Sequence, residues 1–237
     1  MRPKIILFGD SITQQSFENG GWGASLANHF CRTVDVVVRG YSGYNTRWAV
    51  QVMDKVFPSD VSSSPPLAVT IFFGANDASL PDRSSASQHV PIHEFKHNLT
   101  SMVSFVKKRW PTAVVLLITP PPIDEDGRLK NCCQDDSSGL PERTNEAAHA
   151  YAKECVGVAA ECGVPVVDLW SEMQLFRNWE KTLLSDGLHL TPTGNKIVFE
   201  QVVGLLKKEG ISLETLPVDL PFFQDIDPND PGKILGK

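Results

Sequence analysis

The sequence predicts an α/β fold in which one parallel sheet lies between two layers of helices. Five segments are rich in Val, Ile, Leu and Phe with hardly a polar interruption, which is typical of strands buried on both faces. Helical patterns lie between these segments, and such an alternation is typical of an open, doubly wound sandwich. At 237 residues, the chain suits one large domain of this class.

The first expected strand is the apolar run Lys4–Phe8, which ends at a glycine. Four later runs share its nearly continuous apolar character: Thr33–Val38, Leu67–Phe73, Ala113–Thr119 and Val164–Asp168. Because strands of this kind are covered on both faces, we expect a five-stranded parallel sheet.

Helices are expected between the strands, near residues 22–30, 46–56, 92–109, 141–162 and 192–208. In the third of these, apolar residues recur at helical spacing, at Ile92, Phe95, Leu99, Met102 and Val106. Residues 59–66 form a Ser/Pro-rich loop, and residues 123–140 form a polar, irregular insertion that is a candidate gating loop.

The α/β domain is expected to cover residues 1–210, followed by a Pro/Asp-rich tail over residues 211–237. Four prolines and four aspartates from Pro217 onward predict an extended segment that lies on the surface or is partly disordered. Phe222 and Phe223 suggest at least one anchoring contact within this tail.

Charge and composition exclude several classes of function. The net charge is −6 and no basic run stands out, which argues against nucleic-acid binding. No apolar stretch is long enough for a signal peptide or a membrane span, so we expect a cytoplasmic protein. The five cysteines are scattered and odd in number, which is typical of reduced thiols.

Polar residues follow each predicted strand, and the carboxyl ends of parallel strands share one edge of the sheet. Ser11 follows the first strand, Gly43 the second and Asn76 the third, while Asp186 and His189 stand before the last helix. We therefore expect these residues to meet at one rim.

This set of side chains matches the needs of ester hydrolysis. A serine hydroxyl requires a general base, and a histidine base requires a carboxylate that fixes its tautomer. We assign Ser11 as nucleophile, His189 as base and Asp186 as its carboxylate. The oxyanion needs fixed donors, which the backbone amides of Ser11 and Gly43 and the side-chain amide of Asn76 could supply.

Four segments, "FGDSIT", "RGYSGYNTRWA", "FFGANDA" and "SDGLHLTPTGN", occur in the order of the motifs of the SGNH, or GDSL, hydrolases. The chain resembles that family over residues 5 to about 208, and "ITPPPIDE" makes it most similar to the isoamyl acetate-hydrolysing esterase-like branch. The resemblance implies a flavodoxin-like three-layer sandwich and a cofactor-free serine esterase. It assigns the family's serine, glycine, asparagine, histidine and acid to Ser11, Gly43, Asn76, His189 and Asp186.

The resemblance favours short acetate-type esters as substrates, with water as the acyl acceptor. Carbohydrate O-acetyl esters and lysophospholipids are alternatives, because one fold hosts all these activities. A non-catalytic binding protein on the same scaffold is an alternative of another class. A homodimer is possible from the helix faces and the tail.

Two structural alternatives concern single motifs. Ser11 alone could be the N-cap of the helix that follows it. Residues 93–97, "HEFKH", match the zinc metalloprotease pattern through His93, Glu94 and His97. The apolar stripe of that helix leaves both histidines on its polar side, so we expect a surface pair and no metal site.

Overall fold

The computed structural model describes residues 2–57, 64–131 and 139–236. Within them, five parallel strands form one sheet in the order β2-β1-β3-β4-β5. Their bounds are β1 Lys4–Gly9, β2 Asp35–Gly40, β3 Ala68–Phe72, β4 Val114–Ile118 and β5 Val166–Val167. This is the flavodoxin-like order, in which the chain reverses direction across the sheet between β1 and β3. The predicted fold class is confirmed.

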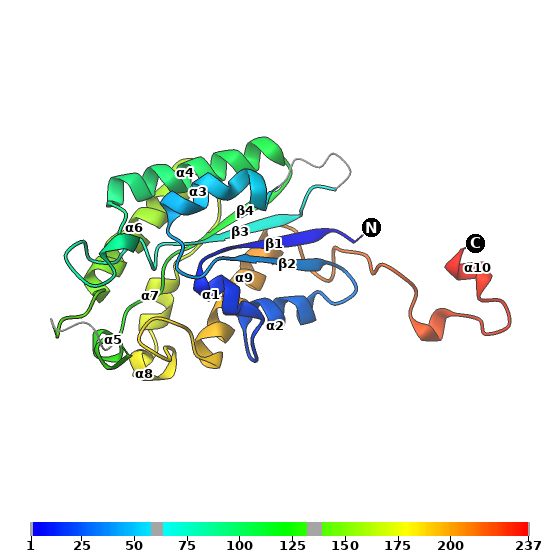
Figure 1. Ribbon diagram of the computed structural model, residues 1–237. Coiled ribbons are helices and arrows are strands. Elements are labelled where there is room, and N and C mark those ends of the chain that lie inside the picture. The colour runs from blue at the N-terminus through cyan, green and yellow to red at the C-terminus, as the bar shows by residue number, and fades with distance from the viewer. Residues whose placement is uncertain (1, 58–63, 132–138, 237) are drawn as a thin grey trace.

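Helices cover both faces of the sheet (Figure 1). One layer contains α3 (Thr46–Val56), α4 (Ile92–Arg109) and α6 (Asn145–Cys162), which pack on one another. The other layer contains α2 (Trp22–His29), α7 (Leu169–Gln174) and α9 (Pro192–Lys208). The result is the predicted three-layer sandwich.

Alternation along β1 explains why this strand lies between the two layers. Ile5 and Leu7 belong to the core beneath α2 and α9, whereas Phe8 belongs to the core beneath α3 and α4. All three side chains are fully buried. Burial on both faces is the reason that the strand contains almost no polar residue.

Several element boundaries differ from the prediction. β2 begins and ends two residues later than expected, and β5 is reduced to two residues. α6 begins at Asn145 instead of residue 141, because the Thr144 hydroxyl accepts a hydrogen bond from the Ala147 amide and caps the helix.

The expectation of an irregular insertion at 123–140 was wrong for its first half, where α5 spans Glu125–Asn131. Residues 132–138, like 58–63 in the Ser/Pro-rich loop, lie outside the described part of the chain. Further short helices connect the main elements: α1 (Ser11–Gln14), η1 (Gln15–Phe17), η2 (Ala86–Gln88), α8 (Trp179–Thr182), η3 (Phe223–Asp225) and α10 (Gly232–Leu235).

The C-terminal segment first packs on the body and then leaves it (Figure 1). Ile211 belongs to the core, and the Asp219 carboxylate forms an ion pair with the Arg2 guanidinium at 2.6 Å. The Arg32 guanidinium lies 4.5 Å from the centre of the Phe222 ring, so the expected aromatic anchor is present, whereas Phe223 is 89% exposed. The boundary at 210/211 stays a prediction. None of the helices in the described ranges combines the length and the hydropathy that a membrane span requires.

Candidate active site

Ser11 lies at the carboxyl end of β1, as the first residue of α1. The helix is capped by Asp10 and not by Ser11, since Asp10 Oδ1 accepts a 3.0 Å hydrogen bond from the Ile12 amide. The Ser11 side chain is therefore not used for capping, and the N-cap alternative is wrong. As the first residue of the helix, Ser11 also has a backbone N–H without an acceptor inside the helix.

The loop before α9 places Asp186 and His189 against Ser11. His189 Nε2 lies 2.9 Å from Ser11 Oγ, and His189 Nδ1 lies 2.8 Å from Asp186 Oδ2. The second carboxylate oxygen of Asp186 accepts hydrogen bonds from the backbone amides of Leu188 and His189 at 3.0 and 2.8 Å. One carboxylate therefore orients both the imidazole ring and the loop that carries it.

The surroundings of Asp186 keep its carboxylate ionised. Burial acts to raise its pKa, but the hydrogen bonds from the His189 ring and backbone and from the Leu188 amide outweigh burial and hold the pKa well below its usual range. The carboxylate and its partners thus favour the Nδ1–H tautomer of His189, which leaves Nε2 as the acceptor that faces Ser11.

Gly43 and Asn76 follow β2 and β3, whose carboxyl ends lie at the same edge of the sheet as that of β1. Gly43 has a φ of +79°, a conformation that favours glycine. Asn76 is 4% exposed, and its Nδ2 donates a 2.8 Å hydrogen bond to the Tyr44 carbonyl in the Gly43 loop. Since an amide nitrogen has two hydrogens, one N–H of Asn76 remains for a further acceptor.

Two buried carboxyl groups support the same loops. Asp77 accepts hydrogen bonds from the Thr46 amide at 3.0 Å and from the Thr46 hydroxyl, which joins the loop after β3 to the start of α3. Burial raises the pKa of both Asp10 and Asp77 to about 7. Asp10 and Asp77 therefore support the backbone of their loops. Neither of them belongs to the chain of hydrogen bonds that joins Asp186, His189 and Ser11.

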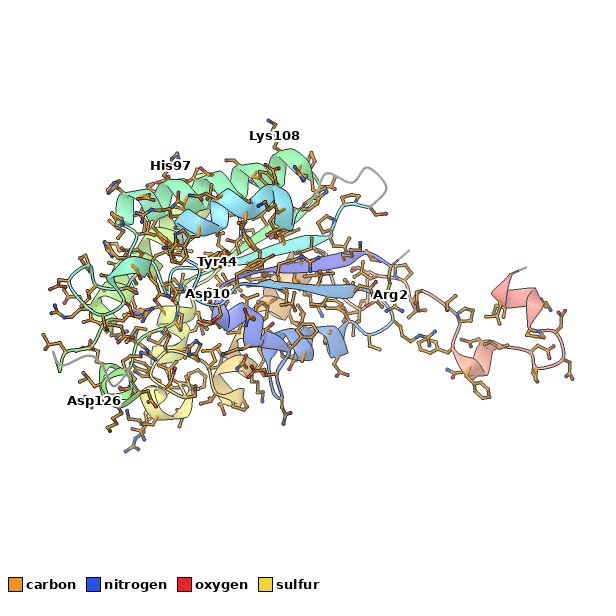
Figure 2. The ribbon with its side chains drawn as sticks, in the orientation of Figure 1. Arg2, Asp10, Tyr44, His97, Lys108 and Asp126 are labelled. Atoms are coloured by element: carbon orange, nitrogen blue, oxygen red, sulfur yellow. The ribbon has the colours of Figure 1, made fainter. Side chains whose placement is uncertain are left out.

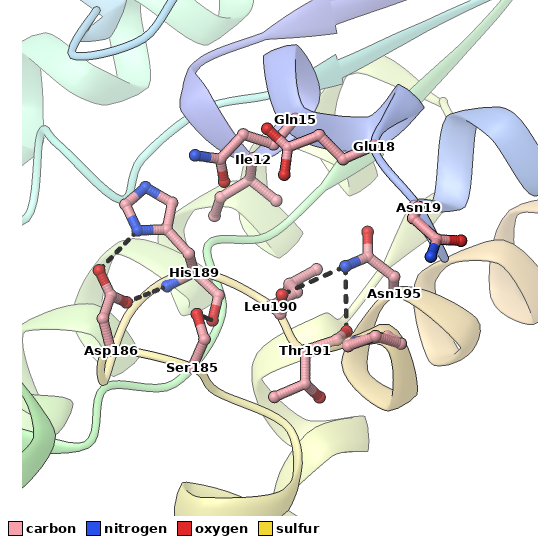
Figure 3. Close-up of a pocket in the computed structure, with 12 residues that line it drawn as sticks. Ile12, Gln15, Glu18, Asn19, Ser185, Asp186, His189, Leu190, Thr191 and Asn195 are labelled. Carbon is pink, nitrogen blue, oxygen red and sulfur yellow. Dashed lines mark hydrogen bonds and ion pairs between the residues drawn. The ribbon is translucent and has the colours of Figure 1, made fainter.

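A pocket of about 410 Å³ opens beside His189 (Figure 3). Ile12 comes from α1, and Gln15 and Glu18 come from η1 and the residue that follows it. The loop before α9 supplies Ser185 and Leu190. The lining is largely polar, which suits a small or hydroxylated group better than a long alkyl chain.

The sequence reasoning missed three side chains that contact the site. Arg128 Nη1 lies 3.0 Å from Asp186 Oδ2, Arg143 Nη2 donates to Asn76 Oδ1 at 3.1 Å, and Gln88 Nε2 donates to the Gly43 carbonyl at 3.1 Å. They come from α5, the segment before α6 and η2, so no strand end or short motif marks them.

The histidines of the zinc alternative lie away from this rim. His93 and His97 are exposed, and Figure 2 shows His97 on the outer side of α4, far from Asp10. Glu94, the base of that alternative, is paired through both oxygens with Arg47 at 2.6 and 2.7 Å. Among the described residues, no group of three or more His, Cys, Asp or Glu is placed to hold a metal ion.

A flavodoxin-like sheet that brings a serine, a histidine and a carboxylate together at its carboxyl edge is typical of a class of serine hydrolases. The chain belongs to the GDSL-like lipase/acylhydrolase family, whose sequence model matches residues 5–202. It is thus a carboxylic ester hydrolase, and the family and activity predicted from the sequence motifs are confirmed.

Relatives and solved structures resemble the chain over nearly its whole length. A GDSL esterase/lipase of Arabidopsis thaliana is 59% identical over 235 residues, which cover 98% of each chain. The isoamyl acetate-hydrolyzing esterase 1 homolog of Homo sapiens is 44% identical over 225 residues, or 94% of this chain and 88% of the relative. The crystal structure of the lipase/acylhydrolase from Enterococcus faecalis, 28% identical, superimposes with a TM-score of 0.68 and covers 93% of this chain and all of that one.

Proposed function

We propose that the protein hydrolyses short-chain carboxylic esters, acetate-type esters above all, through an acyl-enzyme on Ser11. Ser11 Oγ attacks the ester carbonyl while His189 Nε2 accepts its proton. The backbone amides of Ser11 and Gly43 and the side chain of Asn76 bind the oxyanion. His189 then gives the proton to the departing alcohol, and water repeats the cycle on the acyl group.

The observation that carries this proposal is the 2.9 Å contact between His189 Nε2 and Ser11 Oγ. It is the distance that a general base requires, and Asp186 holds the opposite ring nitrogen at 2.8 Å. The non-catalytic alternative gives no reason for a buried serine, a base and a carboxylate to be joined in this way.

Two observations support a small substrate. The pocket beside His189 has a volume of about 410 Å³ and a polar lining, which offers little apolar surface to a long acyl chain. The human, bovine and rodent relatives carry a name that refers to isoamyl acetate. Short esters such as acetate and butyrate are therefore the expected substrates.

A second candidate is the hydrolysis of O-acetyl groups on carbohydrates. Gln15, Glu18, Asn19 and Asn195 line the pocket with amide and carboxylate groups, which suit the hydroxyls of a sugar. A lysophospholipid is a weaker alternative, because its long chain would need an apolar channel.

The test compares the wild type with folded Ser11→Ala on p-nitrophenyl acetate, butyrate and octanoate, and on an acetylated sugar. We expect turnover that falls with chain length and disappears in Ser11→Ala. A preference for octanoate would contradict the short-chain proposal, and activity in Ser11→Ala would contradict the nucleophile.

A cytoplasmic location is part of the same proposal. Among the cysteines that the structure describes, Cys31, Cys155 and Cys162 are free, which is typical of a reducing compartment. Cell fractionation checks the location. The homodimer stays a prediction that light scattering on the eluting peak of a sizing column checks.

A further inference from the structure

Arg143 is a buried cation at the back of the candidate oxyanion site. Its side chain is 4% exposed. Nε donates to the Ala75 carbonyl at 2.9 Å, and Nη1 donates to Glu142 Oε1 at 2.6 Å. Nη2 donates both to Asn76 Oδ1 at 3.1 Å and to Gln88 Oε1 at 2.6 Å. All three guanidinium nitrogens are thus used.

These contacts determine which way the amide of Asn76 points. A guanidinium can only donate, so the atom of Asn76 that faces Arg143 is the oxygen. The nitrogen of Asn76 then faces the Tyr44 carbonyl, which can only accept. Arg143 thereby holds the N–H groups of Asn76 on the side of the Gly43 loop, and its charge polarises the amide toward stronger donation.

Arg143 reaches the second candidate donor through Gln88. The Gln88 oxygen accepts from Arg143, and its nitrogen donates to the Gly43 carbonyl at 3.1 Å. The Asn45 side chain also donates to the Gln88 carbonyl at 2.8 Å. The loop that carries the Gly43 amide is therefore connected to the same guanidinium.

Glu142 connects Arg143 to the acid. Glu142 Oε1 also accepts from Arg128 at 2.6 and 2.9 Å, and Arg128 Nη1 donates to Asp186 Oδ2 at 3.0 Å. The two guanidinium groups are thus matched by two carboxylates, Glu142 and Asp186, and Arg143 is the cation of this group that contacts Asn76. Fixed positive charge in a dry site is favourable for a developing anion.

We propose that Arg143 is a positioning residue that aims the Asn76 side chain and the Gly43 amide at the oxyanion, and that Glu142 and Arg128 tie this arrangement to Asp186. The inference rests on the proposed function, since it concerns the donors that the proposed mechanism uses. Arg143 itself touches no reacting atom and acts through its partners.

The test is a double-mutant cycle with p-nitrophenyl acetate, using wild type, Arg143→Lys, Asn76→Ala and the double variant. Lysine keeps the charge beside Glu142 but cannot reproduce the forked contacts to Asn76 and Gln88. In the wild-type background we expect Arg143→Lys to lower kcat about 10- to 100-fold, within the ~10²–10³-fold loss expected for Asn76→Ala, with KM changed less than about threefold.

In the Asn76→Ala background, Arg143→Lys should lower kcat by less than about fivefold. The remaining loss would come only from the connection of Arg143 to Gly43 through Gln88. Equal losses in both backgrounds would show a merely structural role and overturn the proposal. Arg47→Lys is the matched control, because Arg47 makes a forked pair with Glu94 and has no contact with Asn76. Its kcat should be that of the wild type.

A second variant keeps the test decisive if Arg143→Lys does not fold. Gln88→Ala removes the link between Arg143 and Gly43 at a partly exposed position and should lower kcat about 3- to 10-fold at unchanged KM, whereas Ser87→Ala on the same turn should not. A wild-type kcat in Gln88→Ala would contradict the proposal.

The contact between Arg128 and Asp186 is tested separately, by NMR and by kinetics. The Nδ1–H proton of His189 should give a downfield NMR signal, and Arg128→Gln should shift or broaden it while lowering kcat. An unchanged signal and an unchanged kcat would remove Arg128 from the proposal. Ser11→Ala in the same assay tests the proposed function alone: activity there would contradict the mechanism itself, whatever the cycle gives.

Discussion

His189 Nε2 lies 2.9 Å from Ser11 Oγ, although 178 positions separate the two residues in the chain. The contact forms because Ser11 leaves β1 at the carboxyl edge of the sheet and the loop before α9 returns to that edge. Parallel strands place all such loops on one side, which is how distant residues come to share one site.

Asp186→Asn should lower kcat by roughly 10³–10⁴-fold while the protein stays folded. An asparagine can still accept from the loop amides, but it favours the wrong tautomer of His189 and cannot stabilise the imidazolium. Steady-state kinetics check this, with Asp126→Asn on the exposed side of α5 as the matched control. A loss below tenfold would assign the acid to another residue.

Removal of metal ions should leave turnover unchanged. The proposed mechanism uses no metal, and Glu94 is held by Arg47 at both oxygens. Activity is measured before and after dialysis against EDTA, and in His93→Ala and His97→Ala. If EDTA or either variant abolished activity, the histidine pair on α4 would be the site.

Gly187→Ala should distort the loop before α9, which carries Asp186 and His189. Gly187 has a φ of +87°, and a Cβ there would lie 2.5 Å from the Asp124 carbonyl oxygen and 2.6 Å from the Arg128 amide nitrogen. Strain of about 1–3 kcal/mol and a displaced Asp186 should lower both Tm and kcat.

Gly204→Ala in α9 is the matched control for Gly187→Ala, because nothing lies within 4 Å of its added Cβ. It should stabilise the protein by about 0.4–1 kcal/mol. Thermal unfolding and kinetics on both variants distinguish the two sites. An active Gly187→Ala with wild-type Tm would show that the loop tolerates the side chain.

The buried Asp10 carboxyl should make the free energy of unfolding decrease as the pH rises from about 4 to 7. Its pKa is raised by burial to about 7, so in this range the folded state keeps a proton that the unfolded state has lost. Asp10→Asn retains the cap oxygen for the Ile12 amide but does not titrate. The Tm of the variant should exceed that of the wild type by an amount that grows from pH 5 to pH 8.

The charges of His189, Asp77 and Arg143 act on Asp10, and these three residues are present in both proteins. Asp77, which is also buried with a raised pKa, should give the same downward trend in each. Parallel Tm curves for the wild type and Asp10→Asn would mean that Asp10 does not carry the effect.

The layer order and the rim residues could be predicted because each depends on a local pattern. Buried strands have continuous apolar runs, and Ser11, Gly43 and Asn76 each follow one of these runs. Asp186 and His189 lie three positions apart before a helix that a threonine and a proline mark.

Arg128 and Arg143 could not be predicted in this way. Their partners Asp186 and Asn76 lie 58 and 67 positions away in the sequence. An arginine in a polar segment is predicted to be a surface residue, because the sequence alone does not show that the fold covers it. α5 was missed because it is short, and because Gly127 within it normally argues against a helix. In the fold, Gly127 is needed for close packing, since a Cβ there would lie 2.9 Å from the Gly187 Cα.

The ion pair between Arg2 and Asp219 has a practical consequence. Arg2 lies just before β1, whereas Asp10, which precedes Ser11, lies at the other end of that strand (Figure 2), so the ion pair is at the amino edge of the sheet and Ser11 is at the carboxyl edge. A fusion partner or an affinity tag attached ahead of Arg2 or beyond Asp219 starts from the edge opposite Ser11. An enzyme immobilised on a solid support through either attachment would turn its open pocket toward the bulk solution.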